Sequence, residues 1–241
     1  MNTSTPLETA SPDSPPRSLA LPTVVSLFLS AANFALAGWA WSRLPEGARV
    51  PSHWNFSGQV DAYGSRATVF LAPVIMVGIT LLFLAIPRFD PRQAHLLRSS
   101  RAYAAIWLAL AAFITGLNVV IVRTALGHPV AMEKWMVGAL GVFCIVIGNY
   151  FGKIRSNFFV GIRTPWTLSS ELSWNKTHRV GGWVFAAFGL FLVAAVTAQL
   201  PSRAVFVFIV VSLPLMAISL AAYSYFIWRD DPNRVDRSSL N

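Results

Sequence analysis

Six long stretches of the chain contain no Asp, Glu, Lys or Arg, and this feature constrains the fold more than any other. They span residues 18–42, 67–87, 102–122, 135–152, 180–202 and 204–228. A helix rises about 1.5 Å per residue, so about 20 apolar residues cross a hydrocarbon core of about 30 Å. Only 12% of the 241 residues are charged, against about 25% in soluble domains. We therefore predict an all-α, polytopic membrane protein with six transmembrane helices.

The distribution of the 19 Lys and Arg residues predicts the orientation of these spans. With both termini in the cytoplasm, 13 basic residues face inward: Arg17, Arg88, Arg92, Arg98, Arg101, Lys153, Arg155, Arg163, Lys176, Arg179, Arg229, Arg234 and Arg237. Six face outward: Arg43, Arg49, Arg66, Arg123, Lys134 and Arg203. Short cytoplasmic loops carry the excess of positive charge in membrane proteins. The net charge of +9 is thus interpreted as a topology signal rather than as a nucleic-acid-binding surface.

The same pattern divides the chain into five regions. Residues 1–17, rich in Pro and Ser, are expected to form a disordered cytoplasmic tail. Residues 18–87 form an N-terminal helical hairpin with an outer loop, and residues 88–134 a third helix with its connecting loops. Residues 135–203 hold the fourth and fifth spans, and residues 204–241 the sixth helix and a second cytoplasmic tail.

Few side chains in the predicted spans are suited to chemistry. Cys144 is the one cysteine and lies in the fourth span, so thiols supply neither a disulfide framework nor a metal cluster. All four histidines fall in loops or at span edges, which disfavours a proton-coupled pump. Transporters with broken helices stay open as an alternative, with Pro73 and Pro214 as candidate breaks. We expect no cofactor and no metal.

Small and polar residues in the spans predict close helix packing. Gly148 and Gly152 form a small-xxx-small pair in the fourth span. A second narrow face in the fifth span consists of Gly182, Ala186 and Gly189. Asn118 and Asn149 are expected to hydrogen-bond across helices.

The outer loop, residues 50–66, combines aromatic, polar and turn-forming residues. Pro51 stiffens its start, and Gly58 and Gly64 permit turns with positive φ. Its candidate ligand-side residues are His53, Trp54, Asn55, Gly58 and Asp61. One interpretation is an interfacial loop anchored by its aromatic rings; the other is recognition of a ligand that arrives from outside. A metal site at His53 and Asp61 lacks a third ligand.

The second polar segment, GIRTPWTLSSELSWNKTHR, joins the fourth and fifth spans on the inner side. Its candidate site residues are Gly161, Arg163, Thr164, Pro165, Trp166, Trp174, Thr177, His178 and Arg179. Pro165 suits a helix start, and a short helix is expected from Ser169 or Ser170 to Arg179. On it, Glu171, Trp174 and His178 share one face.

Three interpretations of this inner segment compete. An enzyme site is disfavoured because no nucleophile, metal-ligand set or phosphate-binding glycine loop accompanies Glu171 and His178. Aromatic and basic residues are ordinary at a membrane interface. The compact block from Arg163 to Thr167 favours either a docking surface for a cytoplasmic partner or a structural latch that closes the bundle.

The inner segment, GIRTPWTL followed by Trp174 and KTHR, resembles the signature of the SdpI family, membrane proteins named for immunity to a secreted sporulation-delaying toxin. The outer loop resembles a domain of unknown function that often precedes the SdpI region, through Pro51, His53, Trp54, Asn55, Gly58 and Asp61. The resemblance implies a multi-pass bacterial inner-membrane protein without a cofactor.

Two activities follow from this resemblance: immunity to a membrane-active peptide toxin, and signalling through capture of a small repressor at the membrane. The outer loop would face the toxin and the inner segment the cytoplasmic partner, with membrane lipids around the spans. We predict binding rather than catalysis and no direct contact with nucleic acid. The alternative is a transporter or channel-like protein for a small solute or lipid.

Overall fold

The computed structural model describes residues 19–55 and 57–234, so the predicted tail at residues 1–17 lies outside the described part. The long helices are α1 (Ala20–Arg43), α2 (Leu71–Phe89), α4 (Ser100–Ala125), α5 (Met132–Phe151), α7 (Glu171–Thr197) and α8 (Ser202–Arg229). Shorter elements are β1 (Val50–Trp54), β2 (Val60–Gly64), the 3-10 helix η1 (Arg66–Phe70), α3 (Gln93–Arg98) and α6 (Pro165–Ser169). Six helices, with η1 extending α2, are long and apolar enough to cross a membrane, which confirms the predicted fold class.

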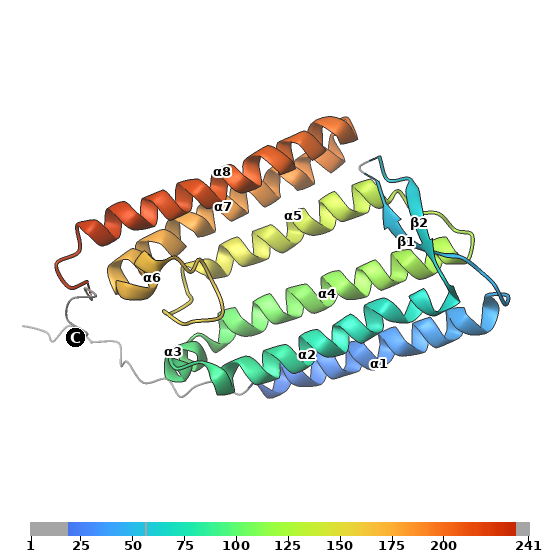
Figure 1. Cartoon of the computed structure of the whole chain (residues 1–241), viewed down its shortest axis with the longest axis horizontal. Helices are drawn as coiled ribbons and strands as arrows, with labels where there is room; N and C mark the ends of the chain where they lie inside the picture. Colours follow the sequence, from blue (N-terminus) through green and yellow to red (C-terminus); the bar gives the residue numbers. More distant parts are fainter. Residues whose placement is uncertain (1–18, 56, 235–241) are drawn as a thin grey trace, which may run out of the picture.

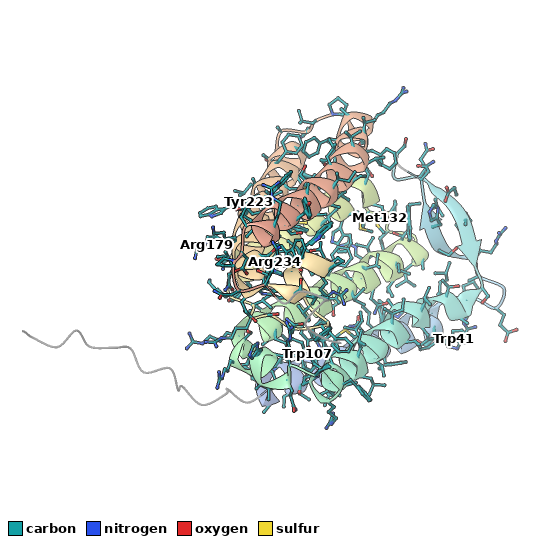
Figure 2. All side chains as sticks on the ribbon, turned by 60° about the vertical axis from the view of Figure 1, so that its left-hand side comes forward. Trp41, Trp107, Met132, Arg179, Tyr223 and Arg234 are labelled. Atoms are coloured by element: carbon teal, nitrogen blue, oxygen red, sulfur yellow. The ribbon has the colours of Figure 1, made fainter. Side chains whose placement is uncertain are left out.

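The long helices run side by side as one elongated bundle (Figure 1). Helices α1, α2 and α4 pack on one another, α5 packs on α4 and α7, and α8 packs on α7. The β1–β2 hairpin covers one end of the bundle, which we call the hairpin end (Figure 1). Helices α3 and α6 lie at the other, which we call the loop end because residues 152–164 also fold there. In Figure 2, Trp41 and Met132 lie toward the hairpin and Arg179 and Arg234 away from it.

Buried polar side chains join α1, α2 and α4. The Ser26 hydroxyl lies 2.7 Å from the Thr80 hydroxyl and accepts the Trp107 indole N–H at 3.1 Å. The Asn118 amide donates to Asn33 Oδ1 at 2.8 Å, as expected for Asn118. Each such bond contributes about 1 kcal/mol in a membrane. Asn149, by contrast, is exposed, so its expected interhelical role is wrong.

Helices α5 and α7 touch backbone to backbone, because glycines face each other across the contact. A Cβ atom added at Gly148 would lie 2.5 Å from the Gly182 carbonyl oxygen and 2.6 Å from the Ala186 nitrogen. A Cβ added at Gly189 would lie 2.8 Å from the Ile145 nitrogen. The narrow face predicted from Gly182, Ala186 and Gly189 on the fifth span is therefore the surface on which α5 packs. Gly152 is exposed, and the nearest atom to an added Cβ is the Arg179 Cα at 3.6 Å. Of the predicted Gly148–Gly152 pair, Gly148 alone makes the close contact with α7.

Three local predictions need correction. The short helix expected before the fifth span is continuous with that span, since Glu171–Thr197 is one helix. The outer loop contains a β-hairpin, and of its two glycines Gly58 has a positive φ of 75° whereas Gly64 does not. Helices α2 and α8 continue through Pro73 and Pro214 without a break.

The glycine contact predicts that Gly148→Ala lowers stability by about 1–3 kcal/mol, the range for overpacked interiors. Thermal unfolding of the purified protein in detergent measures this. Gly138→Ala on the same helix is the matched control, because a Cβ there has no neighbour within 4 Å. An equal melting temperature for both variants would contradict the close contact.

Candidate functional site

The hairpin is built by the residues of the outer motif. Strand β1 pairs antiparallel with β2, with Val50 opposite Gly64 and Trp54 opposite Val60. The Asn55 side-chain oxygen accepts the backbone N–H groups of Ser57 and Gln59, both at 3.0 Å. Gly58 adopts the left-handed conformation, and a Cβ there would clash with Glu133 at the start of α5. Asn55 and Gly58 therefore shape the turn and hold it against α5.

His53 and Asp61 face each other across the hairpin. Their Nδ1 and Oδ1 atoms are 2.6 Å apart, and both side chains are exposed. No group of three His, Cys, Asp or Glu side chains close enough to hold a metal ion occurs among residues 19–55 and 57–234. The neighbouring Trp54 is half-buried and packs against an apolar cluster that includes Ala37, Val50 and Ile121.

A cavity of about 500 Å³ lies beside this hairpin, at the hairpin end of the bundle. Four motif residues line it: His53, Trp54, Asn55 and Gly58. The wall also includes the first turns of α5, from Met132 to Leu140, and apolar residues of α7 and α8 such as Ala195, Val205 and Ile209. Most lining residues are apolar, and the charged ones are His53 when protonated, Glu133 and Lys134. This composition suits an apolar ligand with a polar end.

At the loop end, Trp174 and His178 form the centre of a buried cluster. Both side chains are fully buried and their rings stack with centroids 4.0 Å apart. The Trp174 indole donates to the Ile154 carbonyl at 2.7 Å. His178 Nδ1 lies 2.9 Å from the Trp174 carbonyl, and Nε2 accepts the Ile162 N–H at 2.9 Å. A carbonyl only accepts and an N–H only donates, so His178 is a neutral imidazole with its proton on Nδ1.

Gly161 and Asn157 shape the loop that covers this pair. Gly161 has a φ of 121°, and a Cβ there would clash with His178 Nε2. The Asn157 side chain is fully buried, donates to the Arg155 and Val160 carbonyls, and accepts the Phe159 and Val160 N–H groups at 2.9 and 2.7 Å. All its hydrogen-bonding atoms are used inside the loop.

Helix caps fix the next part of the segment. Thr164 caps α6 by accepting the Thr167 N–H, while the Thr167 hydroxyl accepts the Thr164 N–H, and Pro165 occupies the first helical turn as predicted. Ser170 caps α7 by accepting the Ser173 N–H at 2.9 Å.

The end of α8 is tied to these caps. Ser170 donates to the Asp231 carboxylate, which lowers the pKa of Asp231. Ser173 donates to the Ser224 carbonyl at 2.8 Å, and the Thr164 and Ser224 hydroxyls lie 2.9 Å apart.

A second tie links the end of α2 to the same loop. The buried Asp90 carboxylate accepts the N–H groups of Arg92 and Phe158, at 2.7 and 3.1 Å. Arg92 in turn donates to the Ser156 hydroxyl and to the Leu168 carbonyl. The α2–α4 connection, the α5–α7 connection and the residues after α8 are therefore held to one another at the loop end.

The predicted inner-site residues divide into two sets. Trp174, Thr177 and His178 are fully buried, so the face that Trp174 and His178 share cannot serve as a docking surface for a cytoplasmic partner. Arg163, Pro165 and Arg179 are exposed, and Trp166 is half-buried with its ring against Tyr225. The buried set fits a latch, and a docking surface has to use the exposed set.

Sequence reasoning missed Asp90, Asn157, Ser224 and Asp231, which all hold the loop end together. Asp90 is the one acidic residue among Arg88, Arg92, Arg98 and Arg101, and that contrast is a sequence signal that could have identified it. Asp231 lacks this signal, because Asp230 and Asp236 lie in the same segment.

The fold and both ends define a multi-pass helical membrane protein. Residues 153–224 match the model of the SdpI/YfhL protein family, and residues 28–77 match a domain of unknown function, DUF1648. The chain is 25% identical to the immunity protein SdpI of Bacillus subtilis (strain 168) over 206 residues, which cover 84% of this chain and 95% of that protein. No solved structure matches the chain significantly. These findings confirm the resemblance to the SdpI family.

The burial of Trp174 predicts that Trp174→Ala removes the folded protein from the membrane, because truncating a buried Trp costs about 3–5 kcal/mol. Membrane abundance and melting temperature measure the effect. Lys176→Ala, on the exposed face of the same helix, is the control and leaves both unchanged. Normal abundance of Trp174→Ala would refute the latch.

Proposed function

We propose that this protein confers immunity to, or senses, a membrane-active peptide toxin, and that an apolar segment of the toxin binds in the cavity at the hairpin end. The cavity carries the proposal, because it is lined both by the outer motif and by residues 195–209 of the SdpI-matched region. The Bacillus subtilis relative is an immunity protein, which supports a toxin as the ligand.

Binding rather than catalysis fits the chemistry of this cavity. Glu133 lies against Gly58 of the hairpin, Lys134 adds a positive charge to the lining, and apolar side chains such as Leu117, Leu140 and Val205 form much of the remaining wall. An apolar peptide segment would bury its side chains against this wall and pair its polar groups with the rim. A segment that arrives from water gains about 25 cal/mol per Å² of apolar area buried, and one that arrives from the bilayer gains affinity through van der Waals packing and polar contacts instead.

The orientation belongs to this proposal. The loop end carries most of the basic residues, so we place it and both termini in the cytoplasm of a bacterial inner membrane. The hairpin end then faces the toxin. A cytoplasmic regulator would meet exposed cations such as Arg163, Lys176 and Arg179, whereas Trp174 and His178 would act only by holding the loop.

The alternative, a pathway for a small solute or lipid, requires polar groups that remain available to the solute. The buried hydroxyls and amides of α1, α2 and α4 bond mainly to one another: Ser26 to Thr80 and Trp107, and Asn33 to Asn118. Among the buried side-chain atoms of these three helices, Asn118 Oδ1 is without a partner. Because these polar side chains bond to one another, they favour a role in helix packing over a role in a transport pathway.

The orientation predicts opposite reporter signals at two loops. A reporter fused after Gly127, in the α4–α5 connection, should read as outside the cytoplasm. A reporter fused after Ser169, between α6 and α7, should read as cytoplasmic. Swapped signals would reverse the assignment of both ends.

Filling the cavity is expected to abolish immunity. Val137 lines the cavity on α5, and Val137→Trp adds a large ring to that space. Survival and membrane potential of a toxin-sensitive bacterium, challenged with a sporulation-delaying-type peptide, measure protection. Wild type should protect the cell and Val137→Trp should not, at matched membrane abundance.

The control for this experiment is Val142→Trp, on the same helix but 56% exposed and outside the cavity lining. It should protect as well as wild type. Protection by Val137→Trp equal to wild type would reject the cavity as the toxin site, and no protection by wild type would reject the toxin role.

A further inference from the structure

A second hollow, of about 410 Å³, lies at the base of the hairpin and is separate from the cavity described above. Its lining residues are Trp41, Gly47, Ala48, Arg49, Tyr63, Gly64, Ser65, Arg66 and Ala67. They come from the end of α1, the α1–β1 connection, the end of β2 and the start of η1. Because Val50 pairs with Gly64, the residues just before β1 and just after β2 meet here.

Two arginines bring positive charge to this hollow, and the lining contains no acidic residue. The Arg66 guanidinium lies over the Trp41 ring, 3.9 Å from its centroid, and that of Arg49 lies 5.4 Å from the Tyr63 centroid. The nearby Asp61 carboxylate is engaged with His53. Within the described part of the chain, the guanidinium groups of Arg49 and Arg66 contact aromatic faces but have no carboxylate partner.

The Arg66 Nε–H group is the unpaired donor at this hollow. It is buried and has no hydrogen-bond acceptor among the described residues. Protein covers this atom, but no acceptor in the described part of the chain fixes the Arg66 guanidinium, so its outer N–H groups stay available to a ligand in the hollow that Arg66 lines. Guanidinium groups bind carboxylates and phosphates through paired N–H···O bonds, and phosphate is the group that phospholipid headgroups present.

We propose that this hollow binds the phosphate of an anionic phospholipid headgroup. Arg66 contacts the phosphate oxygens from the inner wall of the hollow, and the exposed Arg49 contacts them from the rim. This site is independent of the toxin proposal, because it uses different residues and does not depend on which leaflet the hairpin end faces.

A lipid fits better than a soluble anion because of where the hollow lies. Arg43 ends one candidate span and Arg66 begins the next, so the arginines sit at the expected level of the headgroups. Three aromatic rings continue from the hollow along α1. The ring centroids of Trp41 and Phe70 are 5.6 Å apart, and those of Phe70 and Phe34 are 6.4 Å apart. Trp41 and Phe34 are seven residues apart, about 10 Å along α1. These partly exposed rings form a track on which an acyl chain can lie.

The test uses the purified full-length protein in a neutral detergent. Native mass spectrometry would compare retention of phosphatidylglycerol with that of phosphatidylcholine, and thermal unfolding would measure stabilisation by each lipid. We expect wild type to prefer phosphatidylglycerol. Each of R49Q and R66Q should weaken phosphatidylglycerol binding about tenfold, as expected for the loss of one charge-assisted contact, and the double variant should lose the preference.

R43Q is the matched control. Arg43 lies at the same end of the bundle, over the Trp39 ring, but does not line the hollow, so R43Q should bind as wild type does. Because Arg49 is exposed, R49Q tests the site even where R66Q impairs folding.

Two results would overturn the proposal. One is phosphatidylglycerol binding by R49Q that equals that of wild type, or a phosphatidylglycerol preference that persists in the double variant. The other is equal stabilisation of wild type by millimolar inorganic phosphate without lipid, which would identify a site for free anions instead.

Discussion

The direct backbone contact between α5 and α7 determines the arrangement of both ends of the molecule. Because Gly148 meets Gly182 and Gly141 meets Gly189, the two helices lie closer than larger side chains would allow. At the hairpin end, this contact sets the first turns of α5 beside Ala195 and Val196 of α7, which form part of the cavity wall. At the loop end, the residues between Phe151 and Glu171 have to connect two touching helices, so they fold over the bundle instead of spanning a gap.

That folded connection explains the polar motif of the loop end. A connection at a membrane surface leaves backbone groups unpaired unless nearby side chains bond to them. Here Asn157, Thr167 and His178 do so: Asn157 satisfies two N–H groups and two carbonyls, and His178 joins the Ile162 N–H to the Trp174 carbonyl. Thr167 accepts from Thr164 and donates to the Ile162 carbonyl. The spacing of Trp174 and His178 is thus accounted for by closure of the loop.

The sequence predicted the spans well, because each charge-free stretch is close to or longer than the roughly 20 residues that cross a hydrocarbon core, and charged residues mark its ends. It also predicted the start of α6 and the glycine face of α7, since capping and small-residue packing are local patterns. It failed where partners are distant in the chain. The face shared by Trp174 and His178 is visible in the sequence, but whether that face meets solvent or protein depends on residues 154–162. Asp231 was missed for the same reason, as its partner Ser170 lies 61 positions away.

The two attachments of α8 explain why the cavity lies where it does. At the loop end, polar contacts hold α8: Asp231 accepts from Ser170, and the Ser224 carbonyl accepts from Ser173. At the hairpin end it packs through apolar and aromatic side chains, with Phe208 against Phe188 and Phe191. Of the residues in the apolar stretch of α8, only 11% are buried inside the protein, against 44% in the corresponding stretch of α4. A ligand that enters beside Val205 and Ile209 therefore replaces lipid and apolar contacts while the polar attachment at the loop end stays intact. An apolar segment binds there at low cost to the fold, whereas a ligand that reached the buried Trp174 and His178 rings would have to open the hydrogen bonds to Ile154 and Ile162.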